Sequence, residues 1–119
     1  MSKAVKIYHN PRCSKSRETL NLLQSHGVEP EVVLYLDAPA DAATLRQLLK
    51  MLGMESAREL MRRKEELYAS LNLADSSLSE EELIQAMVEH PKLMERPIVV
   101  ANGQARIGRP PEQVLEIIG

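Results

Sequence analysis

Apolar and polar positions alternate along the chain in a pattern that predicts strands near both ends. Residues 5–8 and 31–36 are rich in apolar and β-branched side chains, and the segment between them, 17–26, has the periodicity of a helix. A strand, a helix and a strand within about thirty residues form a parallel strand pair with a right-handed crossover. The N-terminal part of the chain therefore predicts a β-α-β unit.

The C-terminal part predicts a hairpin followed by a helix. Residues 97–100 and 105–107 are two short apolar runs on either side of Asn102-Gly103. This dipeptide favours a two-residue turn, because both of its positions tolerate positive φ. A last short helix is expected to place three apolar residues on one face: Val114, Leu115 and Ile118.

The middle of the chain carries helix start and stop signals. Asp41 is a suitable N-cap for a leucine-rich helix that ends at Gly53. Ser56 and Ser79 are each followed three residues later by a glutamate, which is the capping-box pattern, so each is predicted to open a helix. Pro91 is expected to end the last of these helices.

The order of these elements is that of the thioredoxin and glutaredoxin fold, an α/β fold with a four-stranded mixed sheet. We expect one domain over residues 1–119, with a helical insertion at about 41–91 between strand two and the C-terminal hairpin. With three tyrosines, no phenylalanine and no tryptophan, the core must consist mainly of aliphatic side chains and methionine.

The only cysteine, Cys13, lies between the first predicted strand and the first predicted helix. Free backbone N–H groups and the helix dipole at such a position stabilise a thiolate and bind anions. A lone cysteine is otherwise a small buried apolar residue. Cys13, however, has Arg12, Ser14 and Lys15 as neighbours, and this electropositive context favours a reactive thiol.

Composition and charge exclude several classes of protein. The formal net charge of −2 implies no general affinity for nucleic acid. One cysteine allows neither an intramolecular disulfide nor a cysteine-cluster metal site, and no His/Asp/Glu group has metal-ligand spacing, so we expect no metal. No apolar run approaches the ~20 residues of a membrane span, and no signal peptide is evident. A cytoplasmic location without membrane association is therefore expected.

A family resemblance appears in the segment around the cysteine. His9-Asn10-Pro11-x-Cys13, followed by Ser16-Arg17, resembles the signature of the ArsC-type arsenate reductases, the class linked to glutathione and glutaredoxin. The resemblance continues at residues 60–62, 95–100 and 109–110 and covers essentially the whole chain. The chain is similar to a short member of the family, without the C-terminal extension of the longer reductases.

The resemblance implies catalytic roles around the thiol. Cys13 matches the nucleophilic thiolate, His9 the histidine that helps to keep this thiol ionised, and Ser16 a serine near the thiolate. From the residues themselves, an imidazolium at His9 would favour a thiolate four positions away.

The resemblance also implies an oxyanion site and a cis-proline beside it. The arginines that surround the oxyanion and the covalent arsenic intermediates in the family are matched by Arg62, Arg96 and Arg109. The cis-proline of thioredoxin-like folds is matched by Pro97. Arginine suits this role independently of any resemblance, because its planar fork binds the oxygens of a tetrahedral oxyanion in pairs.

These observations predict an arsenate reductase that acts in arsenical resistance through a covalent Cys13 adduct, with no bound cofactor. Because the chain has one cysteine, the electrons must come from thiols outside it. Glutathione and glutaredoxin are the donors that the resemblance implies, and a monomer is expected. Two alternatives remain open: a glutathione-dependent thiol–disulfide oxidoreductase with little arsenate activity, and a non-catalytic module that docks a protein partner.

Overall fold

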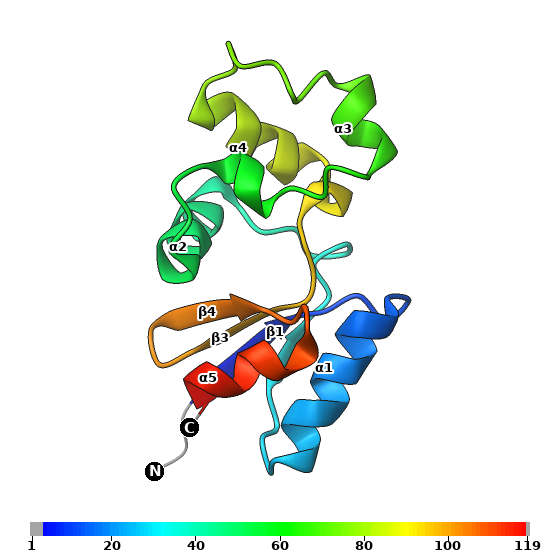
Figure 1. Cartoon of the computed structure of the whole chain (residues 1–119), viewed down its shortest axis with the longest axis vertical. Helices are drawn as coiled ribbons and strands as arrows, with labels where there is room; N and C mark the ends of the chain where they lie inside the picture. Colours follow the sequence, from blue (N-terminus) through cyan, green and yellow to red (C-terminus); the bar gives the residue numbers. More distant parts are fainter. Residues whose placement is uncertain (1–3, 119) are drawn as a thin grey trace. The chain divides into compact units, whose positions relative to one another are not determined.

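The computed structural model describes residues 4–118, which form two compact units (Figure 1). The first unit combines the N-terminal residues up to Ala38 with the residues from Arg96 onward, and the second unit spans Pro39–Glu95. The expected helical insertion at 41–91 falls inside the second unit. The two units are described separately below.

The first unit is built on a four-stranded mixed sheet. Its strands are β1 (Val5–Tyr8), β2 (Glu31–Val33), β3 (Ile98–Ala101) and β4 (Gln104–Ile107), in the order β2-β1-β3-β4. β1 pairs with β2 in parallel and with β3 antiparallel, and β3 pairs antiparallel with β4. The predicted mixed sheet is therefore confirmed.

The strand ends follow local chemistry. Asn102 and Gly103 have φ values of 56° and 74°, so the hairpin turn is the one that the dipeptide predicts. β2 is shorter than the predicted 31–36, because the backbone N–H groups of Asp37 and Ala38 both donate to the Leu34 carbonyl and turn the chain away.

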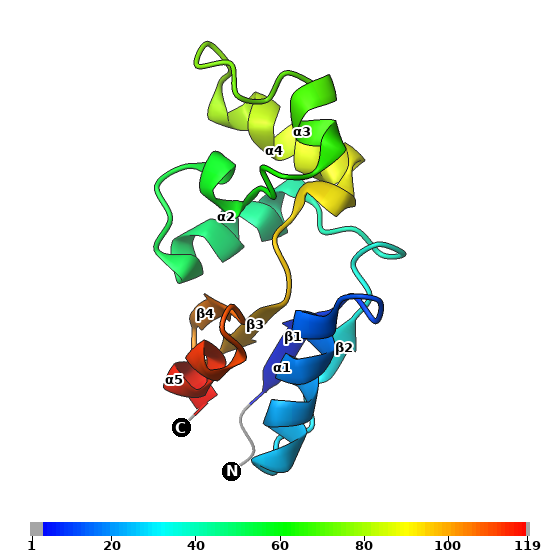
Figure 2. The same ribbon diagram turned by 45° about the vertical axis from the view of Figure 1, so that its right-hand side comes forward.

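Helices on one face of this sheet bury the main core of the unit. They are α1 (Ser14–Ser25), the 3₁₀ turn η3 (Pro111–Val114) and α5 (Leu115–Ile118), and Figure 2 shows α1 and α5 beside the strands. The core is aliphatic, as expected, and consists of Val5, Ile7, Leu23, Val99, Ala101, Val114 and Ile117.

The buried face of the last helix differs from the prediction. Val114 and Ile117 are buried, whereas Leu115 and Ile118 are only half-buried. The chain first forms η3, whose 3.0 residues per turn place side chains three positions apart above one another. The prediction assumed an α-helical period throughout.

Gly108 allows α1 to approach the end of β4 closely. A Cβ atom at position 108 would meet Thr19 Oγ1 and would lie 2.8 Å from Pro97 Cγ. Thr19 is fully buried on α1, and its hydroxyl donates to the Lys15 carbonyl at 2.8 Å. The absence of a side chain at Gly108 thus fixes how near the helix lies to the hairpin.

The second unit is helical. It contains α2 (Ala42–Leu52), the 3₁₀ turn η1 (Ala57–Leu60), α3 (Glu66–Ser70), α4 (Glu80–Glu89) and the 3₁₀ turn η2 (Pro91–Leu93). The caps at Asp41, Ser56 and Ser79 are present as predicted. None of the helices that the structure describes is long and apolar enough to cross a membrane.

The capping box at Ser56 opens only a 3₁₀ turn, not the predicted helix. After Leu60 the chain is extended: Met61 pairs with Met94, and the Arg62 N–H donates to the Leu93 carbonyl at 2.7 Å. This tertiary pairing satisfies backbone groups that a continued helix would otherwise use.

Candidate active site

Cys13 is the N-cap residue of α1. The helix begins at Ser14, three residues before the predicted start, and the Arg17 N–H donates to the Cys13 carbonyl at 3.0 Å in its first turn. The prediction was late because a cysteine is not a typical N-cap residue. The observed start places the thiol directly at the free amides of the helix terminus.

The pKa of the Cys13 thiol is lowered from its ordinary value, although the side chain is half-buried. Burial raises this pKa, but the backbone N–H of Ser16, the Arg96 guanidinium and the backbone N–H of Lys15 together lower it by more. Both amides belong to the first turn of α1, so the N-terminus of the helix is what favours the thiolate.

Two of the three predicted arginines lie at the thiol. Arg109 Nη2 is 3.8 Å from Cys13 Sγ, and Arg109 Nε donates to the Arg96 carbonyl at 2.9 Å. Arg96 is half-buried, and its positive charge favours the Cys13 thiolate. The Arg96-Pro97 peptide is cis, as predicted, and Arg109-Pro110 is also cis.

Arg62 belongs to the second unit, where its Nε lies 3.4 Å from a carboxylate oxygen of Glu95. Both side chains are about one-quarter exposed. The participation of Arg62 in an oxyanion site with Cys13 stays a prediction.

His9 and Ser16 form a buried pair next to the cysteine loop. His9 Nδ1 lies 2.6 Å from Ser16 Oγ, and the Asn10 N–H donates to the same oxygen at 3.0 Å. Burial, followed by the charge of Arg17, lowers the pKa of His9 below its ordinary 6.5. A lowered pKa favours the neutral imidazole over the expected imidazolium, and the role of His9 beside the thiolate stays a prediction.

The hydrogen bonds show what holds this pair in place. A neutral imidazole can accept the Ser16 hydroxyl at Nδ1 while its proton resides on Nε2. Ser16 is fully buried, and its backbone N–H is one of the groups that lower the pKa of the Cys13 thiol. The His9 side chain is thus bonded to a residue in the first turn of α1, next to the thiol.

Two further residues lie at the site to which the sequence analysis assigned no role. Asn10 is buried, and its Oδ1 accepts the Arg12 N–H at 3.0 Å, which shapes the loop before Cys13. Tyr35 follows β2, is fully buried and lies within electrostatic range of Cys13 and Arg96. The motif around Cys13 pointed to Asn10, but no local signal singled out Tyr35.

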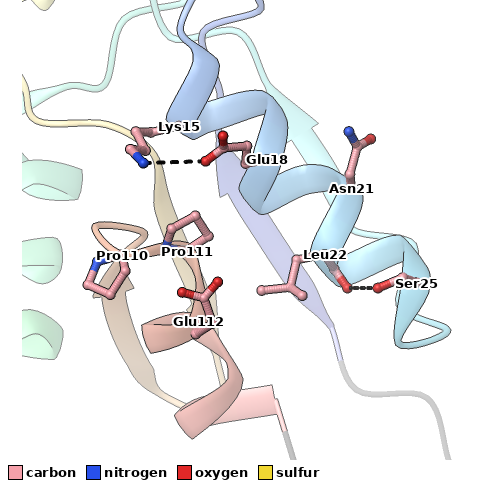
Figure 3. Close-up of a pocket in the computed structure, with 8 residues that line it drawn as sticks. All are labelled: Lys15, Glu18, Asn21, Leu22, Ser25, Pro110, Pro111 and Glu112. Carbon is pink, nitrogen blue, oxygen red and sulfur yellow. Dashed lines mark hydrogen bonds and ion pairs between the residues drawn. The ribbon is translucent and has the colours of Figure 1, made fainter.

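A groove of about 540 Å³ runs between α1 and residues 110–112 (Figure 3). Leu22, Pro110 and Pro111 supply its apolar lining, and the ion pair between Lys15 and Glu18, 3.5 Å apart, lies at its edge. Cys13 is not among the residues that line this groove. Within residues 4–118, no group of three or more His, Cys, Asp or Glu side chains could hold a metal ion.

Comparisons with known proteins agree with this geometry. A model of the ArsC family matches residues 8–117. The chain is 84% identical over 119 residues to a protein of Escherichia coli K12 described as uncharacterized protein YfgD, with both chains covered in full. It is 52% identical over 115 residues to a protein of Haemophilus influenzae named arsenate reductase, covering 97% of this chain and 99% of that protein.

The fold agrees with that of solved structures. The arsenate reductase from Vibrio cholerae superposes with a TM-score of 0.96 at 59% sequence identity, covering 98% of this chain and 99% of the other. The four-stranded mixed sheet, with a cysteine at the N-terminus of the first helix, is a thioredoxin-like arrangement. On the family match and these relatives together, the chain belongs to the ArsC family.

Proposed function

We propose that this protein is an arsenate reductase, which reduces arsenate to arsenite through a covalent adduct on Cys13. One observation carries the proposal: a thiol of lowered pKa lies at a helix N-terminus beside the guanidinium groups of Arg96 and Arg109. A nucleophilic thiolate and donors suited to a tetrahedral oxyanion therefore occupy one place. The name arsenate reductase, given to relatives that are 52% and 48% identical, supports the choice of oxyanion.

In the first step, the Cys13 thiolate attacks arsenic and forms an S–As bond. One arsenate oxygen leaves as water after protonation, and arsenic remains in the pentavalent state. Arg96, Arg109 and the first amides of α1 bind the remaining oxygens and stabilise the charge that develops on them. Arg62 is included as a third oxyanion ligand on the basis of the family signature.

In the second step, a glutathione thiolate attacks the Cys13 sulfur. The S–As bond breaks, and arsenic keeps the electron pair and leaves as arsenite. Cys13 is then joined to glutathione in a mixed disulfide, which a second thiol, from glutaredoxin or glutathione, reduces. The balance is one arsenate and two thiols giving one arsenite, one disulfide and one water. Since the chain has one cysteine, both of these thiols are external.

A thiol–disulfide oxidoreductase is the second candidate, because a single low-pKa cysteine also suffices for exchange with glutathione. A non-catalytic docking module is the third. A steady-state assay with glutathione and glutaredoxin, supplied with either arsenate or a small disulfide, separates the first two. An arsenate reductase turns over arsenate, whereas a thiol reductase turns over only the disulfide. Cys13→Ser abolishes both activities but leaves a docking function intact.

A further inference from the structure

A cavity of about 300 Å³ lies beside the cysteine loop, on the side of β2. One wall is formed by the residues that follow β1 and the other by the segment that follows β2. The lining residues are His9, Asn10, Pro11 and Arg12 on the first wall, and Leu34, Leu36 and Asp37 on the second. All of them belong to the first unit, and the cavity is of the size that small ligands occupy in proteins.

The loop wall of the cavity is held within one turn of Cys13. The Cys13 N–H donates to the Asn10 carbonyl at 3.0 Å, and the Arg12 N–H donates to Asn10 Oδ1 at 3.0 Å. These bonds close a β-turn over residues 10–13, whose first and last Cα atoms lie within about 7 Å of each other. Arg17 Nη1 donates to the Pro11 carbonyl at 2.8 Å and ties the turn to α1. A small ligand in the cavity is therefore within reach of the Cys13 sulfur.

The lining combines apolar side chains with one free charge on each wall. Leu34 and Leu36 are large apolar side chains, yet they are 40% and 36% exposed. The guanidinium of Arg12 and the carboxylate of Asp37 are also exposed, and within residues 4–118 neither group has an ion pair or a hydrogen bond. A cation on one wall and an anion on the other suit a small zwitterionic molecule with an apolar middle.

The cavity lies on the side of the cysteine loop away from the strands that the two arginines flank. In the sheet, β1 has β2 on one side and β3 on the other. Arg96 precedes β3 and Arg109 follows β4, whereas the cavity walls follow β1 and β2. Arsenic bound by the two guanidinium groups thus leaves from one side of the Cys13 sulfur. Displacement at sulfur by a thiolate proceeds in line, so the attacking thiolate must approach from the other side.

We propose that this cavity binds glutathione, the thiol that attacks the Cys13 sulfur. The inference rests on the proposed function, in which an external thiol displaces arsenic from Cys13. Arg12 binds the glycine carboxylate of glutathione, and Asp37 binds the ammonium group of its γ-glutamyl residue. The two leucines pack against the methylene groups between these charges. The glutathione sulfur forms the S–S bond as the S–As bond breaks, and arsenic keeps the electron pair.

A thiol exchange reaction on Cys13 tests this site without arsenate. Cys13 is first converted to a mixed disulfide with thionitrobenzoate. Glutathione then displaces the coloured thionitrobenzoate thiolate and is itself joined to Cys13 in a new disulfide. For the wild type, the rate should saturate as the glutathione concentration rises, because glutathione binds before it reacts. 2-Mercaptoethanol, which carries neither charge, should react at a rate proportional to its concentration.

Substitution of the two charged residues should weaken the binding of glutathione alone. Arg12→Ala and Asp37→Asn should each raise the half-saturating glutathione concentration about 10-fold, the value typical of losing one hydrogen bond between charged groups. Because both side chains are exposed and unpaired in the free protein, the Tm and the reaction with 2-mercaptoethanol should not change. Arg63→Ala and Glu112→Gln remove exposed charges outside the cavity and should behave as the wild type.

The ethyl ester of the glycine carboxylate shows which charge of glutathione meets Arg12. Esterification should raise the half-saturating concentration about 10-fold in the wild type but not in Arg12→Ala, where the contact is already absent. A wild-type rate proportional to glutathione concentration, or charge variants that saturate like the wild type, would overturn the inference. Saturation in this assay without any arsenate-dependent oxidation of glutathione would instead contradict the proposed function.

Discussion

At the scale of single residues, the reactivity of Cys13 follows from its neighbours. Burial opposes ionisation of the thiol, and the amides of the first helical turn together with Arg96 overcome that opposition. The Arg96 guanidinium lowers the pKa of the thiol both by hydrogen bonding and by its charge. It should therefore matter for the ionisation of Cys13 and for the binding of an oxyanion alike.

Replacement of Arg96 by alanine should raise the pKa of Cys13 towards the ~8.5 of a free thiol, because a stabilising positive charge is lost. It should also lower kcat/KM for arsenate by a factor that corresponds to a loss of about 2–4 kcal/mol of transition-state stabilisation, as loss of one oxyanion-hole donor does. The rate of alkylation against pH measures the first effect, and steady-state kinetics the second.

Two variants sharpen this test. Arg63→Ala removes an exposed arginine and should change neither quantity. Arg96→Lys should keep the pKa of Cys13 close to that of the wild type, because the positive charge remains. It should restore kcat/KM for arsenate only in part, because a point charge cannot reproduce the planar fork of arginine. Equal behaviour of Arg63→Ala and Arg96→Ala would contradict the oxyanion site as described.

His9 should make stability depend on pH. The pKa of His9 is lower in the folded protein than the 6.5 of an exposed histidine in the unfolded chain. Between the folded-state and unfolded-state pKa values, the unfolded chain therefore binds more protons than the folded one. Stability should therefore fall as the pH drops below about 6.5, with a slope from this group of at most about 1.4 kcal/mol per pH unit. His9→Asn, whose amide can still bond Ser16, should flatten that slope in denaturant titrations between pH 7 and 5.

The control for this prediction is His26→Asn, which changes an exposed histidine at the end of α1. Its pH profile should follow that of the wild type. If His9→Asn and the wild type lost stability in parallel below pH 6.5, a buried neutral histidine would be the wrong description of His9.

At the scale of elements, the close packing of α1 against the end of β4 depends on the absence of a side chain at Gly108. Gly108→Ala should destabilise the protein by about 1–3 kcal/mol, because the new methyl group overlaps Thr19 on the helix and Pro97 beside the sheet. Denaturant unfolding measures the effect. The double variant Thr19→Ala/Gly108→Ala should lose less than the sum of the two single variants, since the methyl group can then fill the space left by threonine. Strict additivity would contradict this contact.

Some of these elements could be predicted from the sequence, and others could not. The hairpin turn at Asn102-Gly103 and the cap at Asp41 depend on residues two or three positions apart, so both were predicted correctly. The helix expected after Ser56 failed because the backbone of Arg62 pairs with Leu93, thirty-one positions away. Local signals place caps and turns, whereas long-range pairing decides where an element ends.

At the scale of the whole molecule, the candidate site combines a local motif with distant segments. The loop from His9 to Cys13 pointed to a reactive thiol, and the arginines at 96 and 109 came from the family signature. The place of Tyr35 beside Arg96 was not predictable, because it depends on burial and on a residue 61 positions later in the chain. The lowered pKa of His9 likewise depends on burial, which the sequence does not show.

The central claim is that Cys13 transfers electrons from external thiols to arsenate. Oxidation of glutathione that requires both arsenate and Cys13 tests it most directly. With glutaredoxin present, the wild type should oxidise two glutathione molecules for each arsenite formed. Cys13→Ser should neither oxidise glutathione in response to arsenate nor form arsenite. Glutathione oxidation that is independent of arsenate, or arsenite formation that persists in Cys13→Ser, would contradict the account.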